Sequence, residues 1–387
     1  MIKTALLAGV LAAAAAVAGP AHAAQPLPVS FHTANASGQQ ISMPAGSTSY
    51  TWTGSTFTPG IAITELVASW NASTPDGSWI QVQMQGVTDK GAQTKWYTMG
   101  IWAFDDDVIQ RTSVGGQGDA NGYVAIDTFF AKDHPLVSYT LRVTLNRTSA
   151  AVASPVVTKL GALASDMPNQ TPYIPSPLGG AEGITLAVPQ LSQEIHAGQY
   201  PQFDNGGEAW CSPTSTSMVV QYWGKGPSKS DLAWVDPSYA DPQVDYAARY
   251  TFDYHYDGAG NWPFNTAYAA HFGLDAFVTQ LRSLTEAEQF IKAGIPLVAS
   301  IAAQPNKLTG FLFRGTDGHL LVIVGFTKTG DVVANDPAET SDATVRKVYN
   351  RSEFERAWLN ATGGIVYVIH PGSRPLPANT PGATPNW

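Results

Sequence analysis

The 387-residue sequence has few cysteines, few charges and no clusters of basic residues. Its one cysteine, Cys211, cannot form a disulfide within the chain, so stability has to come from packed cores rather than covalent cross-links. Charged residues make up 13%, and 21 Lys and Arg against 30 Asp and Glu give a net charge of -9. Phosphate binding needs clustered basic side chains, so we expect no nucleic-acid partner and no attraction to an anionic membrane surface.

Long hydrophobic runs are also missing, except at the N-terminus. Lys3 precedes a stretch rich in Ala, Leu and Val over residues 5–19, and a small-residue triplet follows at 21–23. This pattern is typical of a secretory signal peptide over residues 1–23 and predicts cleavage before Ala24. The stretch is shorter than the roughly 20 residues of a membrane-spanning helix, so we expect a secreted, extracellular protein with no membrane span.

The chain is long and apolar enough for more than one domain, because hydrophobic residues make up 44% of it. Residues 24–165 alternate apolar and polar positions between turn signals, which predicts an all-β sandwich domain. Residues 166–183 are rich in Pro and Gly and predict a linker. Residues 184–373 mix helical and strand patterns, which predicts an α+β domain, and residues 374–387 read as a flexible Pro-rich tail.

The first domain contains six stretches with a period-2 pattern and several tryptophans. The expected strands are Ile61–Trp70, Trp79–Gln85, Lys95–Ala103, Tyr123–Phe130, Val137–Leu145 and Val156–Leu163. Trp70, Trp79, Trp96 and Trp102 have two possible roles, core packing or a stacking platform for sugar rings. Core packing is the commoner role, and the platform would give this domain a polysaccharide or cell-wall contact.

The cysteine stands at the expected start of a helix that runs from just after Cys211 to Trp223. Pro213 fits the first turn, where its missing N–H costs nothing. Unpaired N–H groups and the positive end of the helix dipole favour a thiolate, which is the reactive form of cysteine. A free cysteine on its own is more often a small buried apolar side chain, so a nucleophile needs partners elsewhere in the sequence.

His319 is the candidate base for this thiol. It follows Gly318 and precedes an apolar strand expected over Leu320–Phe326, so a rigid strand would hold its imidazole. We expect solvated or structural roles for the other histidines of the second domain, which occupy loops, a helix or a chain-end position: His196, His255, His271 and His370.

The strand after His319 supplies a candidate orienting group. A turn at residues 328–330 predicts a hairpin that returns Asn335 and Asp336 toward His319. Neighbouring strand residues face opposite sides, so only one of the two can orient the imidazole. We favour Asp336, because a carboxylate holds the tautomer and stabilises the imidazolium.

Acyl chemistry at a thiol also needs donors for the oxyanion that forms. The backbone N–H of Cys211 at a helix start is one such donor. A side-chain amide upstream would complete the site, and Gln190 and Gln193 are both candidates. The spacing of the two residues in the sequence does not show which of them donates to the oxyanion.

Several stretches taken together resemble cysteine peptidase family thirty-nine, the double-glycine peptidases, and in particular the exported stand-alone branch of that family. The stretches are Val188–Gln193, Ala209–Met218, Gly318–Val322 and Val333–Pro337. The resemblance covers residues 184–371, about half of the chain, and leaves the first domain outside it. It departs from the family at Ser212, where many relatives have Gly.

The resemblance implies a papain-like fold and no cofactor. The site residues that it implies are Cys211 as nucleophile, His319 as base, Asp336 as orienting carboxylate and Gln193 as oxyanion donor. Transporter-linked relatives carry this domain on a membrane exporter, and the present sequence has no spanning helix or nucleotide-binding loop. Leader trimming coupled to export is therefore not implied.

The sequence predicts a secreted cysteine peptidase that acts on a peptide or protein substrate through an acyl-enzyme. A thiol amidase or acyltransferase on cell-wall peptides is an alternative, because the fold does not separate these reactions. A catalytically silent surface-binding protein is another. A metal enzyme is disfavoured, because the sequence has no His-Glu-x-x-His motif and no paired cysteines. Nothing in the sequence predicts the oligomeric state.

Overall fold

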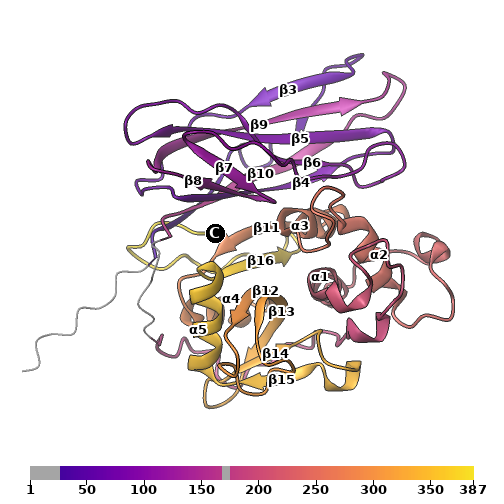
Figure 1. The fold of residues 1–387 in the computed structure, drawn as a ribbon, viewed down its shortest axis with the longest axis vertical. Coiled ribbons are helices and arrows are strands. Elements are labelled where there is room, and N and C mark those ends of the chain that lie inside the picture. The colour runs from indigo at the N-terminus through magenta and orange to yellow at the C-terminus, as the bar shows by residue number, and fades with distance from the viewer. Residues whose placement is uncertain (1–26, 168–174) are drawn as a thin grey trace, which may run out of the picture.

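The computed structural model describes residues 27–167 and 175–387. The expected signal peptide, and residues 168–174 of the expected linker, lie outside the described residues. Figure 1 shows two layers of strands above a mixed domain of helices and strands, with the C-terminus close to the boundary between them. None of the helices that the structure describes has the length and apolar character needed to span a membrane.

The first domain consists of two antiparallel sheets. One has the order β1-β10-β4-β8-β7, with β2 paired to β10, and its strands are β1 (Val29–Thr33), β2 (Ile41–Ser42), β4 (Glu65–Ser73), β7 (Gly122–Ala125), β8 (Thr128–Ala131) and β10 (Val156–Ser165). The other has the order β3-β9-β5-β6, with β3 (Ser49–Thr53), β5 (Ser78–Thr88), β6 (Tyr97–Trp102) and β9 (Leu136–Arg147).

One expected strand of this domain is a hairpin instead. The alternating pattern predicts a single strand over Tyr123–Phe130, but the chain turns between β7 and β8 at Ile126 and Asp127. Ile126 has a positive φ of 57°. The turn has neither Gly nor Asn at its tip, so the usual sequence signal of a tight turn is missing.

The second domain contains one antiparallel sheet and five α-helices among the described residues. The sheet has the order β11-β16-β12-β13-β14-β15, with β11 (Asp275–Gln280), β12 (Leu297–Ala303), β13 (Thr316–Phe326), β14 (Val332–Asn335), β15 (Arg346–Tyr349) and β16 (Ile365–His370). The helices are α1 (Cys211–Tyr222), α2 (Pro242–Thr251), α3 (Trp262–His271), α4 (Leu284–Lys292) and α5 (Arg351–Thr362). Short 3-10 turns are η1 (Glu194–His196), η2 (Gly207–Ala209), η3 (Asp231–Trp234) and η4 (Asp342–Thr344).

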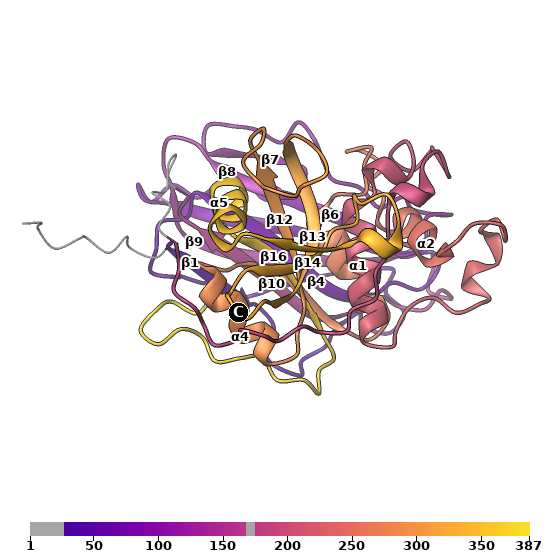
Figure 2. The same cartoon turned by 90° about the horizontal axis from the view of Figure 1, so that it is seen from below.

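Strand β13 separates two packing environments. Leu320 and Val322 lie in the hydrophobic cluster that includes α1, whereas Leu321 and Ile323 lie in the cluster with α4 and α5. This alternation follows from the period of two along a strand. Figure 2 shows α5 and α1 on opposite sides of the strands β12 and β13.

Helix α3 joins the two domains. The ring of Phe264 lies 6.1 Å from that of Trp70 in β4 and 5.3 Å from that of Trp102 in β6. All three side chains are fully buried, and one hydrophobic cluster runs through both domains. Trp70 and Trp102 are therefore core residues, whereas Trp79 and Trp96 are partly exposed.

A buried arginine also crosses the boundary between the domains. Arg111 is fully buried and donates to the carbonyl oxygens of Ala103 and Phe104 in its own domain, at 3.0 and 2.6 Å. It also donates to the carbonyl of Arg249 at the end of α2, at 2.7 Å. A buried charge is tolerated only when hydrogen bonds replace its water, so these bonds fix the position of α2 relative to the first domain.

The ends of the second domain are more ordered than the sequence suggests. The N–H groups of Gly179 and Ala181, in the expected linker, donate to the Glu288 carboxylate in α4. The prediction of a flexible tail over residues 374–387 is wrong: the ring of Trp387 packs 4.9 Å from that of Phe290, and the Asn386 amide donates to the Gln280 carbonyl. These contacts join segments that are far apart in the sequence, and no periodic pattern of residues predicts them.

We predict that Phe264→Ala destabilises both domains together. The change leaves a cavity between two buried tryptophans, so we expect it to cost about 3–5 kcal/mol of unfolding free energy. Urea unfolding followed by tryptophan fluorescence should show one transition, shifted to lower urea. Val348→Ala, at an exposed apolar side chain, is the matched control and should leave the curve unchanged. Two separate transitions, with only one of them shifted, would contradict a shared core.

Candidate active site

Cys211 is the first residue of α1 and is partly buried. Its neighbour Trp210 is the N-cap residue and supplies no side-chain cap, so N–H groups of the first turn stay available to a ligand. The Trp210 indole donates to the carbonyl of Phe203 at 2.6 Å. Ser215, one turn into the helix, donates to the carbonyl of Leu320 at 3.1 Å and so ties α1 to the strand that carries His319.

His319 and Asp336 form a buried pair. The His319 Nε2 lies 2.7 Å from the Asp336 Oδ1, and both side chains are almost fully buried. Cys211 is close enough to the imidazole to contribute to the rise of its pKa, and α1 is bonded to the strand residue next to His319. Because Nε2 is taken by Asp336, Nδ1 is the ring nitrogen that can face the thiol. The structure thus brings Cys211, His319 and Asp336 together in one site.

This environment raises the pKa of His319. Burial alone would lower the pKa of His319, but the charge of Asp336, the hydrogen bond that the imidazole donates to Asp336 and the nearby Cys211 outweigh burial and raise the pKa to about 10. The imidazole is therefore protonated at neutral pH. A protonated imidazole beside a thiol favours the thiolate.

The same contacts hold Asp336 ionised. Burial opposes ionisation, but the charge of His319 and hydrogen bonds from His319, Tyr349 and the Ala338 N–H lower the pKa of the carboxyl group. The Tyr349 hydroxyl donates to Oδ2 at 2.6 Å, and the Ala338 N–H donates to Oδ1 at 3.1 Å. Both carboxylate oxygens have donors, so the carboxylate is locked in place beside His319.

Gln193 lies between the segment before Cys211 and the segment after Asp336. Its side-chain Nε2 donates to the carbonyl of Glu208 at 2.7 Å, and its backbone N–H donates to the carbonyl of Pro337 at 2.8 Å. The side chain is buried, and its Oε1 has no hydrogen-bond partner. An amide nitrogen carries two hydrogens, so one remains for a ligand oxygen.

The other two candidates lie outside this arrangement. Gln190 is exposed, and its Oε1 accepts the backbone N–H of Arg346. Asn335 faces α1, and its side-chain amide donates to the carbonyl of Pro189 at 2.8 Å. The opposite orientation of Asn335 and Asp336 follows from strand alternation.

The remaining histidines of the second domain have other contacts. His196 is fully buried and lies 3.2 Å from the Asp245 carboxylate. His271 is exposed and stacks on Phe104 of the first domain, with ring centroids 3.4 Å apart. Neither histidine contacts Cys211 in the interactions that the structure records.

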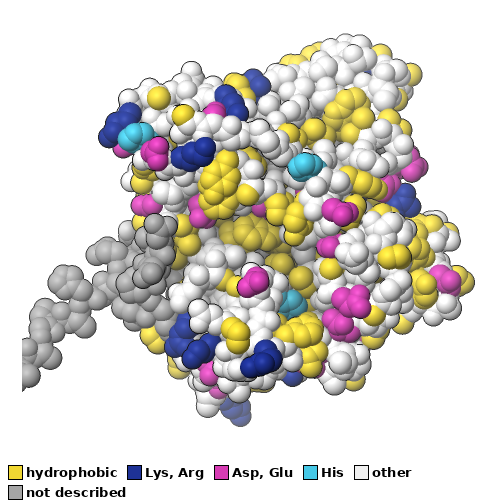
Figure 3. Space-filling view, viewed as in Figure 1, with side chains coloured by type: hydrophobic (Ala, Val, Ile, Leu, Met, Phe, Trp, Pro, Cys, Tyr) yellow, Lys and Arg dark blue, Asp and Glu magenta, His cyan; other side chains and the backbone are white. Residues whose placement is uncertain are grey.

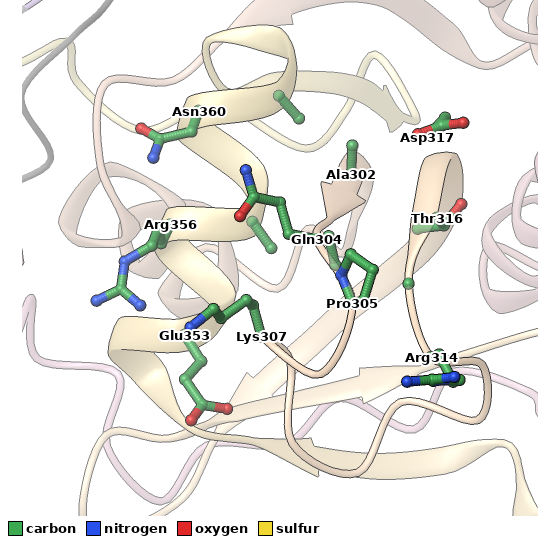
Figure 4. A pocket seen from close by; sticks show the side chains of 14 residues that line it. Ala302, Gln304, Pro305, Lys307, Arg314, Thr316, Asp317, Glu353, Arg356 and Asn360 are labelled. Atoms are coloured by element: carbon green, nitrogen blue, oxygen red, sulfur yellow. The ribbon is translucent and has the colours of Figure 1, made fainter.

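A large cavity lies between α5 and the loop joining β12 to β13. It has a volume of about 750 Å³, and Figure 4 shows Gln304 of that loop pointing toward α5, whose Glu353, Arg356 and Asn360 also line the cavity. Thr316 and Asp317 also line the cavity. Neither Cys211 nor His319 lines it, so the cavity does not contain the reactive groups.

One group of carboxylates in the part of the chain that the structure describes has the geometry to hold a cation. It consists of Asp105, Asp106 and Asp107 in the first domain, and Arg249 already pairs with Asp106 at 2.7 Å. Exposed acidic groups of this kind are common without an ion, so we assign it no role.

Comparison with protein families first gives the class of this chain. Residues 24–165, which the sequence resemblance leaves out, match the model described as the Peptidase C39 N-terminal domain. Residues 185–366 match the Peptidase_C39 like family. The second domain, which carries Cys211, His319 and Asp336, therefore belongs to the Peptidase_C39 like family.

Solved structures add a weaker similarity. A protein from Bacillus anthracis described as a C39-like peptidase is 18% identical over 48% of this chain and 98% of its own, with a TM-score of 0.31. A structure of the infectious bursal disease virus Gx strain is 15% identical over 38% of this chain and 35% of its own, with a TM-score of 0.24. Scores this low carry no conclusion. Comparison with curated proteins finds no match.

Two supporting residues were not foreseen from the sequence. Tyr349 comes from β15, a strand of four residues with no marked pattern, and reaches Asp336 across the sheet edge. Ser215 connects α1 to β13 through one hydroxyl. No spacing rule links either residue to a catalytic motif, so only the folded arrangement reveals them.

We predict that Asp336→Asn makes stability less dependent on pH between 6 and 10. The pKa of His319, about 10, lies above its usual 6.5, so the pair stabilises the fold fully below pH 6.5 and loses this contribution as pH rises through 10. Breaking a buried pair costs about 3–5 kcal/mol, so the stability gap between wild type and variant should be largest near pH 6.

Urea unfolding at pH values from 6 to 10.5 measures this gap. Asp317→Asn, at an exposed carboxylate two residues before His319, is the matched control and should follow wild type throughout. If the difference in stability between wild type and Asp336→Asn stays constant across this pH range, the pKa of His319 is not raised by Asp336.

Proposed function

We propose that this chain is a secreted cysteine peptidase that hydrolyses peptide bonds through a Cys211–His319–Asp336 acyl-enzyme mechanism. The observation that carries the proposal is the buried 2.7 Å contact between His319 and Asp336, with Cys211 near enough to the same imidazole to contribute to the rise of its pKa. Membership of the Peptidase_C39 like family supports peptidase activity.

The first half of the reaction forms a thioester. The thiolate sulfur of Cys211 attacks the carbonyl carbon of the substrate, and the C–N bond breaks as the protonated His319 gives its Nδ1 proton to the leaving amine. Asp336 keeps the imidazole oriented and stabilises its protonated form before the transfer. The acyl group then remains on Cys211.

The second half releases the acyl group. His319, now neutral, takes a proton from water, and the water oxygen attacks the thioester carbonyl. The C–S bond breaks, the carboxylic acid leaves, and the proton on His319 restores the original ion pair with the thiolate. No cofactor enters either half.

In the proposed mechanism, two donors stabilise the oxyanion that forms in both halves. The backbone N–H of Cys211 lies at the uncapped start of α1, and the Gln193 amide lies beside Glu208, three residues before Cys211. Donors aimed at the developing charge lower the barrier more than they stabilise the substrate.

The papain-like architecture is part of the proposal. It is supported by a helix that carries the cysteine at its start and packs on an antiparallel sheet whose neighbouring strands β13 and β14 lead to His319 and Asp336. We also propose that the first domain is a β-sandwich and that residues 1–23 direct export. The lone cysteine is compatible with an oxidising compartment, because it has no second cysteine in the chain to pair with.

We predict that Cys211 is alkylated by iodoacetamide far faster than a free thiol below pH 8. A protonated imidazole beside the sulfur stabilises the thiolate, which is the form that attacks iodoacetamide. His319→Ala should slow the alkylation at pH 6.5 by at least about tenfold, because the thiolate loses its counter-ion. His271→Ala, at a histidine away from the site, is the control and should keep the wild-type rate.

If wild-type Cys211 reacts only above about pH 8.5, like a free thiol, the proposed role of Cys211 as the nucleophile is wrong. The first domain would then be the place to look for function, as a surface-binding module.

We predict that Gln193→Ala lowers kcat toward a cleaved peptide by about 10²–10³. The loss should fall on kcat rather than KM, because the amide acts on the transition state. The alkylation rate of Cys211 should stay unchanged, because the amide has no part in forming the thiolate. Gln190→Ala is the matched control and should retain full kcat, and a similar loss in both variants would rule out Gln193 as the oxyanion donor.

Peptide digests with an added amine acceptor separate hydrolysis from acyl transfer. A peptidase gives free carboxylic acids, and the yield does not depend on the acceptor. Products joined to the acceptor would instead identify an acyltransferase that uses the same thioester, with cell-wall peptides as the next substrates to test.

A further inference from the structure

The loop that joins β12 to β13, residues 304–315, packs against the imidazole of His319. The ring of Phe311 in this loop lies 5.5 Å from the His319 ring, and the Phe311 side chain is buried. The ring of Phe313 lies 5.8 Å from that of Phe311. Two successive ring contacts therefore connect Phe313 to the imidazole that pairs with Asp336.

Hydrogen bonds and apolar packing hold this loop in place. The backbone N–H of Asn306 donates to the carbonyl of Arg314 and closes the base of the loop. The Thr309 N–H and hydroxyl donate to the two carboxylate oxygens of Glu353 in α5, at 2.7 and 3.2 Å. Leu308 is buried in the hydrophobic cluster that includes α5. The loop is therefore tied to α5 as well as to the strand that carries His319.

The loop exposes two large apolar side chains. Leu312 is 45% exposed and Phe313 is 48% exposed. Among the large apolar side chains that are exposed in the described residues, these are the only two that are adjacent in the sequence. Figure 3 shows a histidine side chain on the lower domain with apolar side chains beside it. Single exposed apolar side chains are common on protein surfaces, whereas contiguous ones mark places where a ligand or another protein binds.

The charged side chains of the loop lie elsewhere. Lys307 and Arg314 line the 750 Å³ cavity between the loop and α5, whereas none of residues 311–313 lines that cavity. These three residues have no polar side-chain atom. The part of the loop that connects to His319 through ring contacts is therefore uncharged and apolar.

The proposed mechanism determines which part of a substrate lies next to this part of the loop. His319 gives its proton to the leaving amine, so the nitrogen of the scissile bond has to lie beside the imidazole. Cys211 instead bonds to the acyl half of the substrate. A wall that contacts the imidazole therefore borders the amine half, which begins with the residue after the cleaved bond.

We propose that Phe313, together with Leu312, forms a subsite for an apolar side chain on the amine side of the scissile bond. The subsite rests on the peptidase function proposed above, because it depends on the proton transfer from His319 to the leaving amine. The preferred substrates are then peptides with a large apolar residue directly after the cleaved bond. Phe311 does not contact the substrate and supports Phe313 from below.

A purely structural role of the loop makes a different prediction. If Phe313 only covers Phe311, changes at Phe313 alter stability and leave the choice of substrate untouched. Phe313→Asn removes the exposed ring and leaves Phe311 and the bonds of Thr309 in place. This variant should therefore fold like wild type and lose only the apolar contact with the substrate.

The test uses a peptide that wild type cleaves at one bond, remade with Leu, Phe, Asn or Lys directly after that bond. Wild type should cleave the Leu and Phe peptides with the highest kcat/KM. Phe313→Asn should lower kcat/KM for these two peptides about tenfold and leave the Asn and Lys peptides nearly unchanged. Phe313→Leu keeps an apolar side chain and should retain most of the preference. Val348→Asn, at an exposed apolar side chain of the same domain, is the matched control and should keep all of it.

Two reagents that do not reach the amine side distinguish the possible failures. Iodoacetamide and peptidyl halomethyl ketones, which occupy only the acyl side, should alkylate Cys211 at the same rate in wild type and Phe313→Asn. If both proteins cleave the four peptides with the same preference, the subsite is wrong and the peptidase function stands. If Phe313→Asn changes the selection among halomethyl ketones instead, the loop borders the acyl side and the assignment is wrong. If wild type cleaves no peptide bond, the proposed peptidase function is wrong and the subsite falls with it.

Discussion

The packing of Phe264 against Trp70 and Trp102 is the contact on which the rest of this structure depends. It fixes α3 on the sheets of the first domain. Helix α1 is in turn tied to α3, where Thr216 donates to the side-chain oxygen of Asn265 at 3.2 Å. The helix that carries Cys211 is thus positioned by a core to which both domains contribute. With no disulfide available, this shared core has to supply the rigidity that the site requires.

Buried polar groups lie at the boundary between the domains and add specific pairing to the apolar packing there. Asp253 is fully buried and accepts the Ser113 N–H at 2.9 Å and the Asn261 amide at 2.9 Å. Together with Arg111, it pairs groups of the two domains in one register, because a slipped arrangement would leave buried charges without partners. Only 13% of the residues are charged, and several of these charged residues lie at this boundary. The first domain is therefore held in one orientation relative to the site.

Much of the site was accessible from the sequence, because local rules govern it. Strand alternation separates Asp336 from Asn335, and the helix-start pattern marks Cys211. The choice between Gln190 and Gln193 was not accessible, because both lie in an irregular segment whose path depends on Glu208 and Pro337. The hairpin at Ile126 lacked a turn signal, and the ordered tail depends on tertiary contacts alone. Periodicity describes regular elements and says nothing of contacts between distant segments.

Arg282 connects the two ends of the described chain. Its guanidinium donates to the carbonyl of Val29 in β1 and to the side chain of Asn386 in the tail, at 2.9 and 2.8 Å. The Arg282 side chain is only 6% exposed, so its charge depends on acceptors from both segments in place of water. Loss of either segment would leave part of this buried guanidinium without a partner, so the first strand and the tail are coupled through one side chain although they do not follow one another in the sequence.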